Sequence, residues 1–191
     1  MSFDRYWLLT WTTYGSWLPG DELRSVTTVH NQPGARLRHN IPGTPVDSAM
    51  PGLRRSAERL MKGKPVRLTS HQAQEVMEQF RETARFRNWL LVAAAVMANH
   101  CHVVVGVPGD PEPDTLLRDL KAYASRRLNS RWPRPESGTW WTESGSKRKL
   151  KDNLAILGAA RYVRDQEFPL AVWIDPAFAA ELPDPSTDGT R

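Results

Sequence analysis

The sequence has only one cysteine, Cys101, and no long hydrophobic run. A lone cysteine excludes an internal disulfide framework and a zinc cage built from cysteines, as is typical of a reducing compartment. The longest apolar run, residues 89–98, is too short to cross a bilayer. The first residues also lack the basic start and apolar stretch of a signal peptide. We therefore expect a cytoplasmic protein with no membrane partner.

Glycine is also scarce, with 12 in a chain of 191 residues of which 40% are hydrophobic. Such a chain can bury one sizeable core but hardly two. We expect a single domain over residues 1–168, interrupted at about 21–68 by an insertion rich in proline, glycine and basic residues. Prolines recur after Phe168, so residues 169–191 are expected to form an irregular tail.

Positive charge and tryptophan are both plentiful. The net charge of +5 favours a polyanionic partner, because basic side chains neutralise its phosphates and release its counterions. Eight tryptophans accompany this charge, and aromatic faces beside basic residues can stack on unpaired bases. Packing in the core is the simpler role for any one tryptophan. Charge and tryptophan content thus favour nucleic acid as a partner without establishing it.

Hydrophobic periodicity indicates the order of the elements. A strand is expected over residues 6–13, a short helix within the insertion near 53–61, and a helix from the capping box at Thr69 and Gln72 to about 86. Two antiparallel strands follow at 89–97 and 100–105, joined by a tight turn. Asp114 or Thr115 can cap a helix that ends near 129. Short strands at 139–141 and 147–150 and a helix from Asp152 to about 165 complete the pattern.

This order of strands and helices is the split βαβ arrangement of ferredoxin-like folds. It predicts an α+β protein with an antiparallel sheet and helices packed on one face. The other face of the sheet would then be free for a ligand.

His100 and His102 lie on a predicted strand, where alternate side chains point to the same face. Both imidazoles can therefore bind one metal ion, although two strand histidines can also be simple hydrogen-bonded surface residues. Without cysteine ligands, the ion would be Mg²⁺, Mn²⁺ or Zn²⁺. The next three residues are valines rather than an acidic ligand, which disfavours a metal-dependent hydrolase.

Tyr123 lies at the edge of the apolar stripe of its predicted helix, with Lys121, Arg126 and Arg127 close by. This positive charge suits a phosphodiester and favours a phenolate nucleophile. The alternative is a tyrosine at the rim of the core. A phenolate nucleophile and a histidine-bound metal would together allow a tyrosine to attack DNA.

Residues 96–105, followed by Leu120, Lys121, Ala122 and Tyr123, resemble the single-tyrosine HUH transposases, closest to the REP-associated tyrosine transposases. Residues 12–22 and 140–145 are also similar to that family, and the resemblance covers most of residues 5–168. It implies an HUH fold in which His100 and His102 bind Mg²⁺ or Mn²⁺ and Tyr123 is the nucleophile. It further implies cleavage of single-stranded DNA beside a hairpin or imperfect palindrome through a 5′-phosphotyrosine intermediate, by a monomer or a homodimer.

One position departs from the family pattern. In the family, a polar residue one turn after the tyrosine often completes the metal site, but here that position is Arg127, a cation that cannot bind a metal. Asp119, water or a DNA phosphate are the substitutes, although Asp119 can equally be a solvated surface charge. A non-catalytic, domesticated binder of structured DNA or RNA is therefore an alternative function. A phosphodiesterase that uses activated water is a second alternative.

The expected DNA contacts come from basic and aromatic side chains, each of which can also be a solvated or packed residue. One basic cluster lies in the insertion, and a second follows a tryptophan pair. The expected DNA-binding residues are Lys121, Arg126, Arg127, Trp140, Trp141, Lys147, Arg148 and Lys149.

Overall fold

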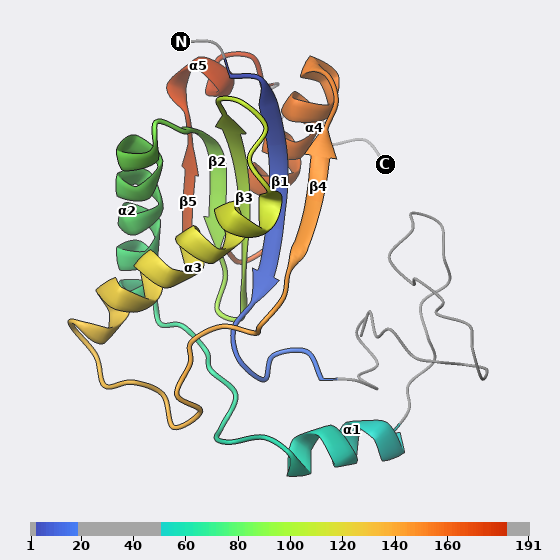
Figure 1. The fold of residues 1–191 in the computed structure, drawn as a ribbon, viewed down its shortest axis with the longest axis vertical. Helices are drawn as coiled ribbons and strands as arrows, with labels where there is room; N and C mark the ends of the chain where they lie inside the picture. Colours follow the sequence, from blue (N-terminus) through green and yellow to red (C-terminus); the bar gives the residue numbers. More distant parts are fainter. Residues whose placement is uncertain (1–2, 19–50, 183–191) are drawn as a thin grey trace.

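The computed structural model describes residues 3–18 and 51–182, which form a five-stranded antiparallel sheet with helices on both faces (Figure 1). The order across the sheet is β4-β1-β3-β2-β5. The strands are β1 (Arg5–Thr12), β2 (Leu90–Val96), β3 (His100–Val107), β4 (Ser146–Leu150) and β5 (Ala171–Ile174). The helices are α1 (Pro51–Arg59), α2 (Ser70–Arg87), α3 (Pro113–Asn129), α4 (Asn153–Arg164) and α5 (Pro176–Ala179). The predicted α+β class with an antiparallel sheet is confirmed.

The helix ends show how far local signals specify the fold. The predicted capping box of α2 is present, with Thr69 accepting from the backbone N–H of Gln72 and Gln72 accepting from that of Thr69. Asp152 caps α4 as expected. The predicted cap of α3 is wrong: this helix begins at Pro113, and Asp114 lies in its first turn. Proline is favoured there because its missing N–H would have no helical partner.

One face of the sheet packs against α2 and α3. Side chains that alternate along β1 and β3 form this core, including Leu9, Trp11, Cys101, Val103 and Val105. Trp11 meets Phe80 of α2 edge to face. Most of the large buried side chains belong to this layer, so this face holds the main core.

The other face is covered in part by α4, which corrects the prediction that helices occupy one face only. The apolar stripe Ile156, Ala159, Ala160 and Val163 packs against Val92, Ala93, Ala95 and Val104 of the sheet. These small sheet residues let α4 lie close to the strands. Figure 1 shows α4 behind the sheet and α3 in front of it.

Two further expectations are corrected. Residues 171–174 are not irregular but form β5, which pairs with β2 at the edge of the sheet, and α5 follows. Residues 139–141 form no strand and make only an isolated bridge between Thr13 and Trp141. Most of the insertion, residues 19–50, and the end of the tail lie outside the described residues. The described helices include none long and apolar enough to span a membrane.

Candidate functional site

The strand β3 places His100 and His102 on the face that α4 covers. His100 is opposite Thr12 of β1, and His102 is opposite Thr10. The two imidazole rings have centroids 4.8 Å apart. Cys101, between them, is buried in the core of the other face. The predicted alternation along this strand is therefore confirmed.

Each imidazole is oriented by a hydrogen bond at its Nδ1 atom. The Nδ1 of His100 lies 2.7 Å from the amide oxygen of Asn99, which can only accept, so this Nδ1 donates. The Nδ1 of His102 lies 2.8 Å from the Oγ1 of Thr10. A ring that donates from Nδ1 keeps a lone pair at Nε2, which is the arrangement of most metal-binding histidines. Both side chains thus fit a metal ligand role.

Burial keeps both rings neutral. Loss of solvent lowers the pKa of His100, and it lowers the pKa of His102 to about 4, with a smaller contribution from the nearby charge of His100. A metal ligand must be unprotonated. The pair is therefore ready to bind a cation at neutral pH.

Tyr162 of α4 brings an aromatic hydroxyl next to His102 on this face. Its ring centroid lies 5.2 Å from that of His102, and the residue is 50% exposed. It precedes Val163, which is buried in the stripe that anchors α4 to the sheet. Tyr162 was missed in the sequence because its helix was expected on the same side as the others. Tyr162 lies near the histidines because α4 packs on their face of the sheet.

Gln166 follows Tyr162 by one helical turn, just beyond the end of α4. Its Nε2 donates to the backbone oxygen of Tyr162 at 2.9 Å. Among the described residues none donates to its Oε1, so this amide oxygen is available as a ligand. Gln166 therefore places an amide group one helical turn after the tyrosine.

The structure does not bring Tyr123 together with the histidines. Tyr123 lies on α3, where its ring contacts Phe86 edge to face and the guanidinium groups of Arg87 and Arg126. Since α3 and the histidine side chains are on opposite faces of the sheet, the sheet itself separates them. Within one chain, the predicted combination of Tyr123 with His100 and His102 is wrong.

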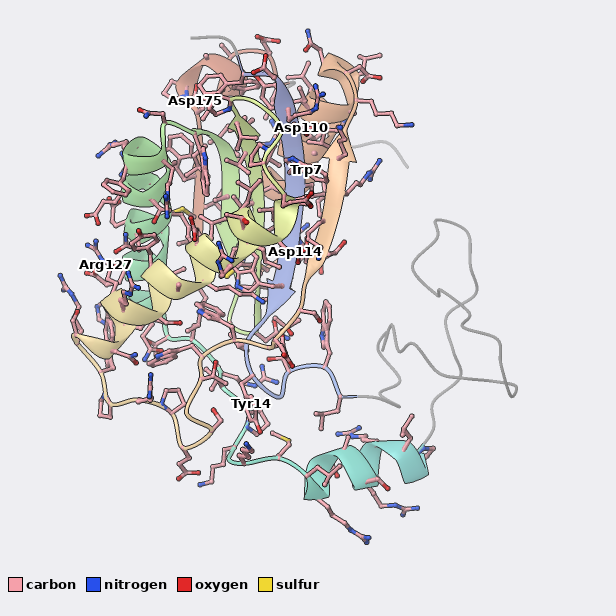
Figure 2. The ribbon with its side chains drawn as sticks, in the orientation of Figure 1. Trp7, Tyr14, Asp110, Asp114, Arg127 and Asp175 are labelled. Atoms are coloured by element: carbon pink, nitrogen blue, oxygen red, sulfur yellow. The ribbon has the colours of Figure 1, made fainter. Side chains whose placement is uncertain are left out.

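Asp119 and Arg127 are structural residues on the same side as Tyr123. The buried carboxylate of Asp119 pairs with Arg87 at 2.7 Å, which ties α3 to the end of α2. Arg127 binds Glu75 and Glu82 of α2, and the hydrogen bond to Glu75 raises its pKa. Figure 2 shows Arg127 between the two helices. Asp119 therefore lies on the opposite side of the sheet from the histidines and cannot complete a metal site with them.

No group of three or more His, Cys, Asp or Glu side chains is arranged to hold a metal within residues 3–18 and 51–182. The two histidines would thus need other donors to complete a metal site. Amide oxygens such as that of Gln166 are donors of a type that hard cations accept.

Three of the expected DNA contacts are buried in the structure. Lys121 donates to the backbone oxygens of Thr142 and Ser144 at 2.8 and 2.7 Å, and burial lowers its pKa to about 8. Trp140 and Trp141 are each 4% exposed, and their indole N–H groups donate to Asn129 and to the backbone of Lys121. These side chains hold residues 140–144 against α3 and are not free to stack on bases.

The basic residues of β4 alternate between the two faces. Lys147 pairs with Asp114 at 2.6 Å, and Lys149 lies over the ring of Trp7, both on the side of α3. Arg148 is exposed and paired with Leu8, so it lies on the histidine face. Arg126 is exposed on α3. Arg148 is therefore the expected DNA contact that shares a face with the histidines.

Trp17 approaches the same region from the segment after β1. Its ring centroid lies 5.7 Å from that of His100, and the residue is 42% exposed. An exposed indole of this kind is suited to stack on an unpaired base. Trp17 lies in one of the segments that resembled the tyrosine transposases.

Two solved structures are similar to the chain. One is described as a REP-associated tyrosine transposase bound to a REP hairpin, with 11% identity and a TM-score of 0.45 over 85% of this chain and 66% of that chain. The other, a candidate transposase from Deinococcus radiodurans R1, has 16% identity and a TM-score of 0.46 over 87% of this chain and 95% of its own. The chain thus spans just under two thirds of the first structure.

No curated protein matches the chain. The model of the family described as "Transposase IS200 like" matches residues 60–166, which is more than half of the sequence and includes both histidines, Tyr123, Tyr162 and Gln166. The chain belongs to the IS200-like transposase family.

Proposed function

We propose that the protein is a single-stranded DNA endonuclease and strand transferase in which Tyr162, rather than Tyr123, is the nucleophile. The observation that supports this most strongly is the 5.2 Å approach of the Tyr162 ring to His102 on one face of the sheet. A half-exposed phenol beside two neutral imidazoles can meet a phosphodiester from solvent.

The reaction is a transesterification. The Tyr162 oxygen attacks phosphorus, the bond from phosphorus to the 3′ oxygen breaks, and the phenolic proton ends on the departing 3′-hydroxyl. The DNA is left with a 5′-phosphotyrosine link and a free 3′-hydroxyl. A 3′-hydroxyl of another strand reverses the step and releases Tyr162, so no external energy is consumed.

The donors of this face fit a divalent cation, Mg²⁺ or Mn²⁺. His100 and His102 would hold it through their Nε2 atoms, since both Nδ1 atoms are engaged. Gln166 would add its Oε1, because it takes the position one turn after the tyrosine that Arg127 takes relative to Tyr123. When bound, such an ion neutralises and orients the scissile phosphate.

The proposed substrate is single-stranded DNA beside a hairpin. The hairpin follows from the resemblance to the REP-associated enzymes, while the single strand also suits the exposed Trp17 ring and the exposed Arg148 around the histidines. Stacking on an exposed indole needs an unpaired base, whereas Arg148 can contact a phosphate.

The test is covalent capture of labelled hairpins with single-stranded flanks in Mn²⁺. We expect the wild type and Tyr123→Phe to form a protein–DNA adduct, and Tyr162→Phe to form none. Tyr123→Phe is the matched control because it makes the same change on the opposite face. Cleavage by Tyr162→Phe without an adduct would instead favour the phosphodiesterase, and metal-independent binding with no cleavage by any form would favour the non-catalytic binder.

A further inference from the structure

A large open cavity lies on the other side of Trp17 from the histidines. Its volume is about 980 Å³, and its walls come from the segment after β1, the end of α1, the first half of α3 and residues 137–143. Small-molecule pockets measure about 300–1,000 Å³. The cavity is therefore large enough for a nucleotide, and no part of the proposed cleavage chemistry uses it.

The walls of the cavity are fixed by hydrogen bonds. The hydroxyl of Tyr14 accepts from the backbone N–H of Lys62 at 2.7 Å, and the backbone oxygen of Tyr14 accepts from Val66 at 2.8 Å. On the opposite side, Lys121 binds the backbone of residues 142–144. Figure 2 shows Tyr14 below the sheet and Asp114 at the start of α3, beside β4. A pocket with fixed walls can bind a ligand without a large ordering cost.

The lining combines aromatic and apolar side chains with hydroxyl groups. Tyr14 and Trp17 contribute rings, and Leu60 contributes an apolar side chain that is 82% exposed. Exposed aromatic and apolar surface in a concave site is suited to a flat heterocycle. Ser125 and Thr139 are among the hydroxyl residues that can bond to its edge.

Charged side chains of both signs line the cavity. Lys121 is already bound to three backbone oxygens, and Asp114 pairs with Lys147 at 2.6 Å. Glu143, Lys62 and Arg118 also line the cavity. The carboxylate of Glu143 can accept a hydrogen bond from the amino group of a base, and the two cations can contact the adjoining phosphates of a strand.

Trp17 connects this cavity to the proposed cleavage site. It lines the cavity, and its ring lies 5.7 Å from that of His100. A DNA strand with a phosphate at the histidines would therefore carry its neighbouring bases past Trp17.

We propose that this cavity binds one or more unpaired bases of the DNA strand that flank the scissile phosphate. This inference rests on the proposed function, since it assigns a second site to the same substrate. The cavity would select single-stranded over duplex DNA, because a paired base is unavailable to it.

The test is fluorescence anisotropy in EDTA with labelled homopolymers of adenine, cytosine or thymine, and with a short duplex. All proteins carry Tyr162→Phe so that no strand is cut. Ala122→Trp fills the cavity from α3, and Leu60→Asp places a charge in its apolar wall at a position too exposed to disturb folding. Gln74→Trp, exposed on α2 outside the cavity, is the matched control.

We expect Ala122→Trp and Leu60→Asp each to weaken binding of at least one homopolymer by about tenfold, the loss of roughly one stacked base. Gln74→Trp should leave homopolymer binding unchanged, and neither cavity variant should change duplex binding. The proposal is overturned if the parent protein, which carries Tyr162→Phe alone, binds no homopolymer. It is also overturned if both cavity variants bind the homopolymers like this parent, or if their duplex and single-strand binding weaken equally. Adduct formation through Tyr162 is measured separately, so failure of the cavity is distinguishable from failure of the proposed cleavage.

Discussion

The ring of Tyr162 lies 5.2 Å from that of His102, and the sheet separates both from Tyr123. This relationship changes which tyrosine can serve the histidines of the same chain. The residue one turn after Tyr162 is Gln166, which has an amide oxygen, whereas the residue one turn after Tyr123 is the cation Arg127. The one departure from the family pattern in the sequence thus disappears when the tyrosine is reassigned.

Thr10 is expected to tune metal affinity through His102. Its Oγ1 lies 2.8 Å from the Nδ1 of His102 and fixes the ring. Thr10→Val keeps the shape of the side chain but removes this bond, so Mn²⁺ binding should weaken by about 10- to 100-fold. Isothermal titration with Mn²⁺ measures the effect, and Thr115→Val on α3 is the control. Unchanged Mn²⁺ affinity in Thr10→Val would show that His102 is not a ligand.

Arg127 is expected to support stability rather than metal binding. Its guanidinium joins α3 to Glu75 and Glu82 of α2 and is largely buried. Arg127→Met should lower the free energy of unfolding by about 1–3 kcal/mol, because Glu75 loses a charged hydrogen bond. Urea unfolding measures this loss. Mn²⁺ affinity should stay as in the wild type, and a large drop in it would contradict the assignment.

The free energy of unfolding of the metal-free protein should decrease as the pH is lowered, because His102 is buried as a neutral ring. The pKa of this ring drops from 6.5 to about 4 on folding because of burial. Between these values the unfolded chain binds the proton and the folded chain does not, so stability is highest above 6.5 and decreases toward 4. The loss attributable to His102 between pH 7 and pH 5 is about 2 kcal/mol. Urea unfolding in EDTA at both pH values should show it in the wild type, and a smaller loss in His102→Gln; equal losses would argue against a buried neutral ring.

Arg148 and Lys149 provide a matched pair for DNA binding, because neighbouring residues of β4 point to opposite faces. Arg148→Ala should weaken single-strand binding and reduce the slope of log affinity against log salt by about one. Lys149→Ala should have a smaller effect, since its ammonium lies over Trp7 on the side of α3. Anisotropy at several salt concentrations compares the two variants. A larger effect of Lys149→Ala would place the DNA on the other face.

Much of the fold could be predicted from local patterns. The capping box at Thr69, the alternation of His100 and His102, and the cap at Asp152 each depend on neighbours in sequence, and all three are confirmed. The strand β5 could not be found in this way because it is only four residues long and is flanked by Pro169 and Pro176. Its pairing with β2 is a tertiary contact that overrides weak local signals.

The choice of tyrosine needed tertiary information. Tyr123 and Tyr162 both lie next to an apolar helical stripe, and periodicity alone cannot assign a stripe to one face of a sheet. The basic neighbours of Tyr123 favoured it, but Lys121 and Arg127 are used in packing contacts. Trp140 and Trp141 were misassigned for the same reason, since burial cannot be read from the charge of adjacent residues.

The most direct test of the account is to map the covalent link itself. The wild-type protein is reacted with a labelled hairpin substrate in Mn²⁺, digested with protease and nuclease, and the nucleotide-bearing peptide is sequenced by mass spectrometry. The account predicts a phosphotyrosine link at Tyr162 that is absent in Tyr162→Phe and retained in Tyr123→Phe. A link at Tyr123, or an adduct that survives Tyr162→Phe, would contradict it.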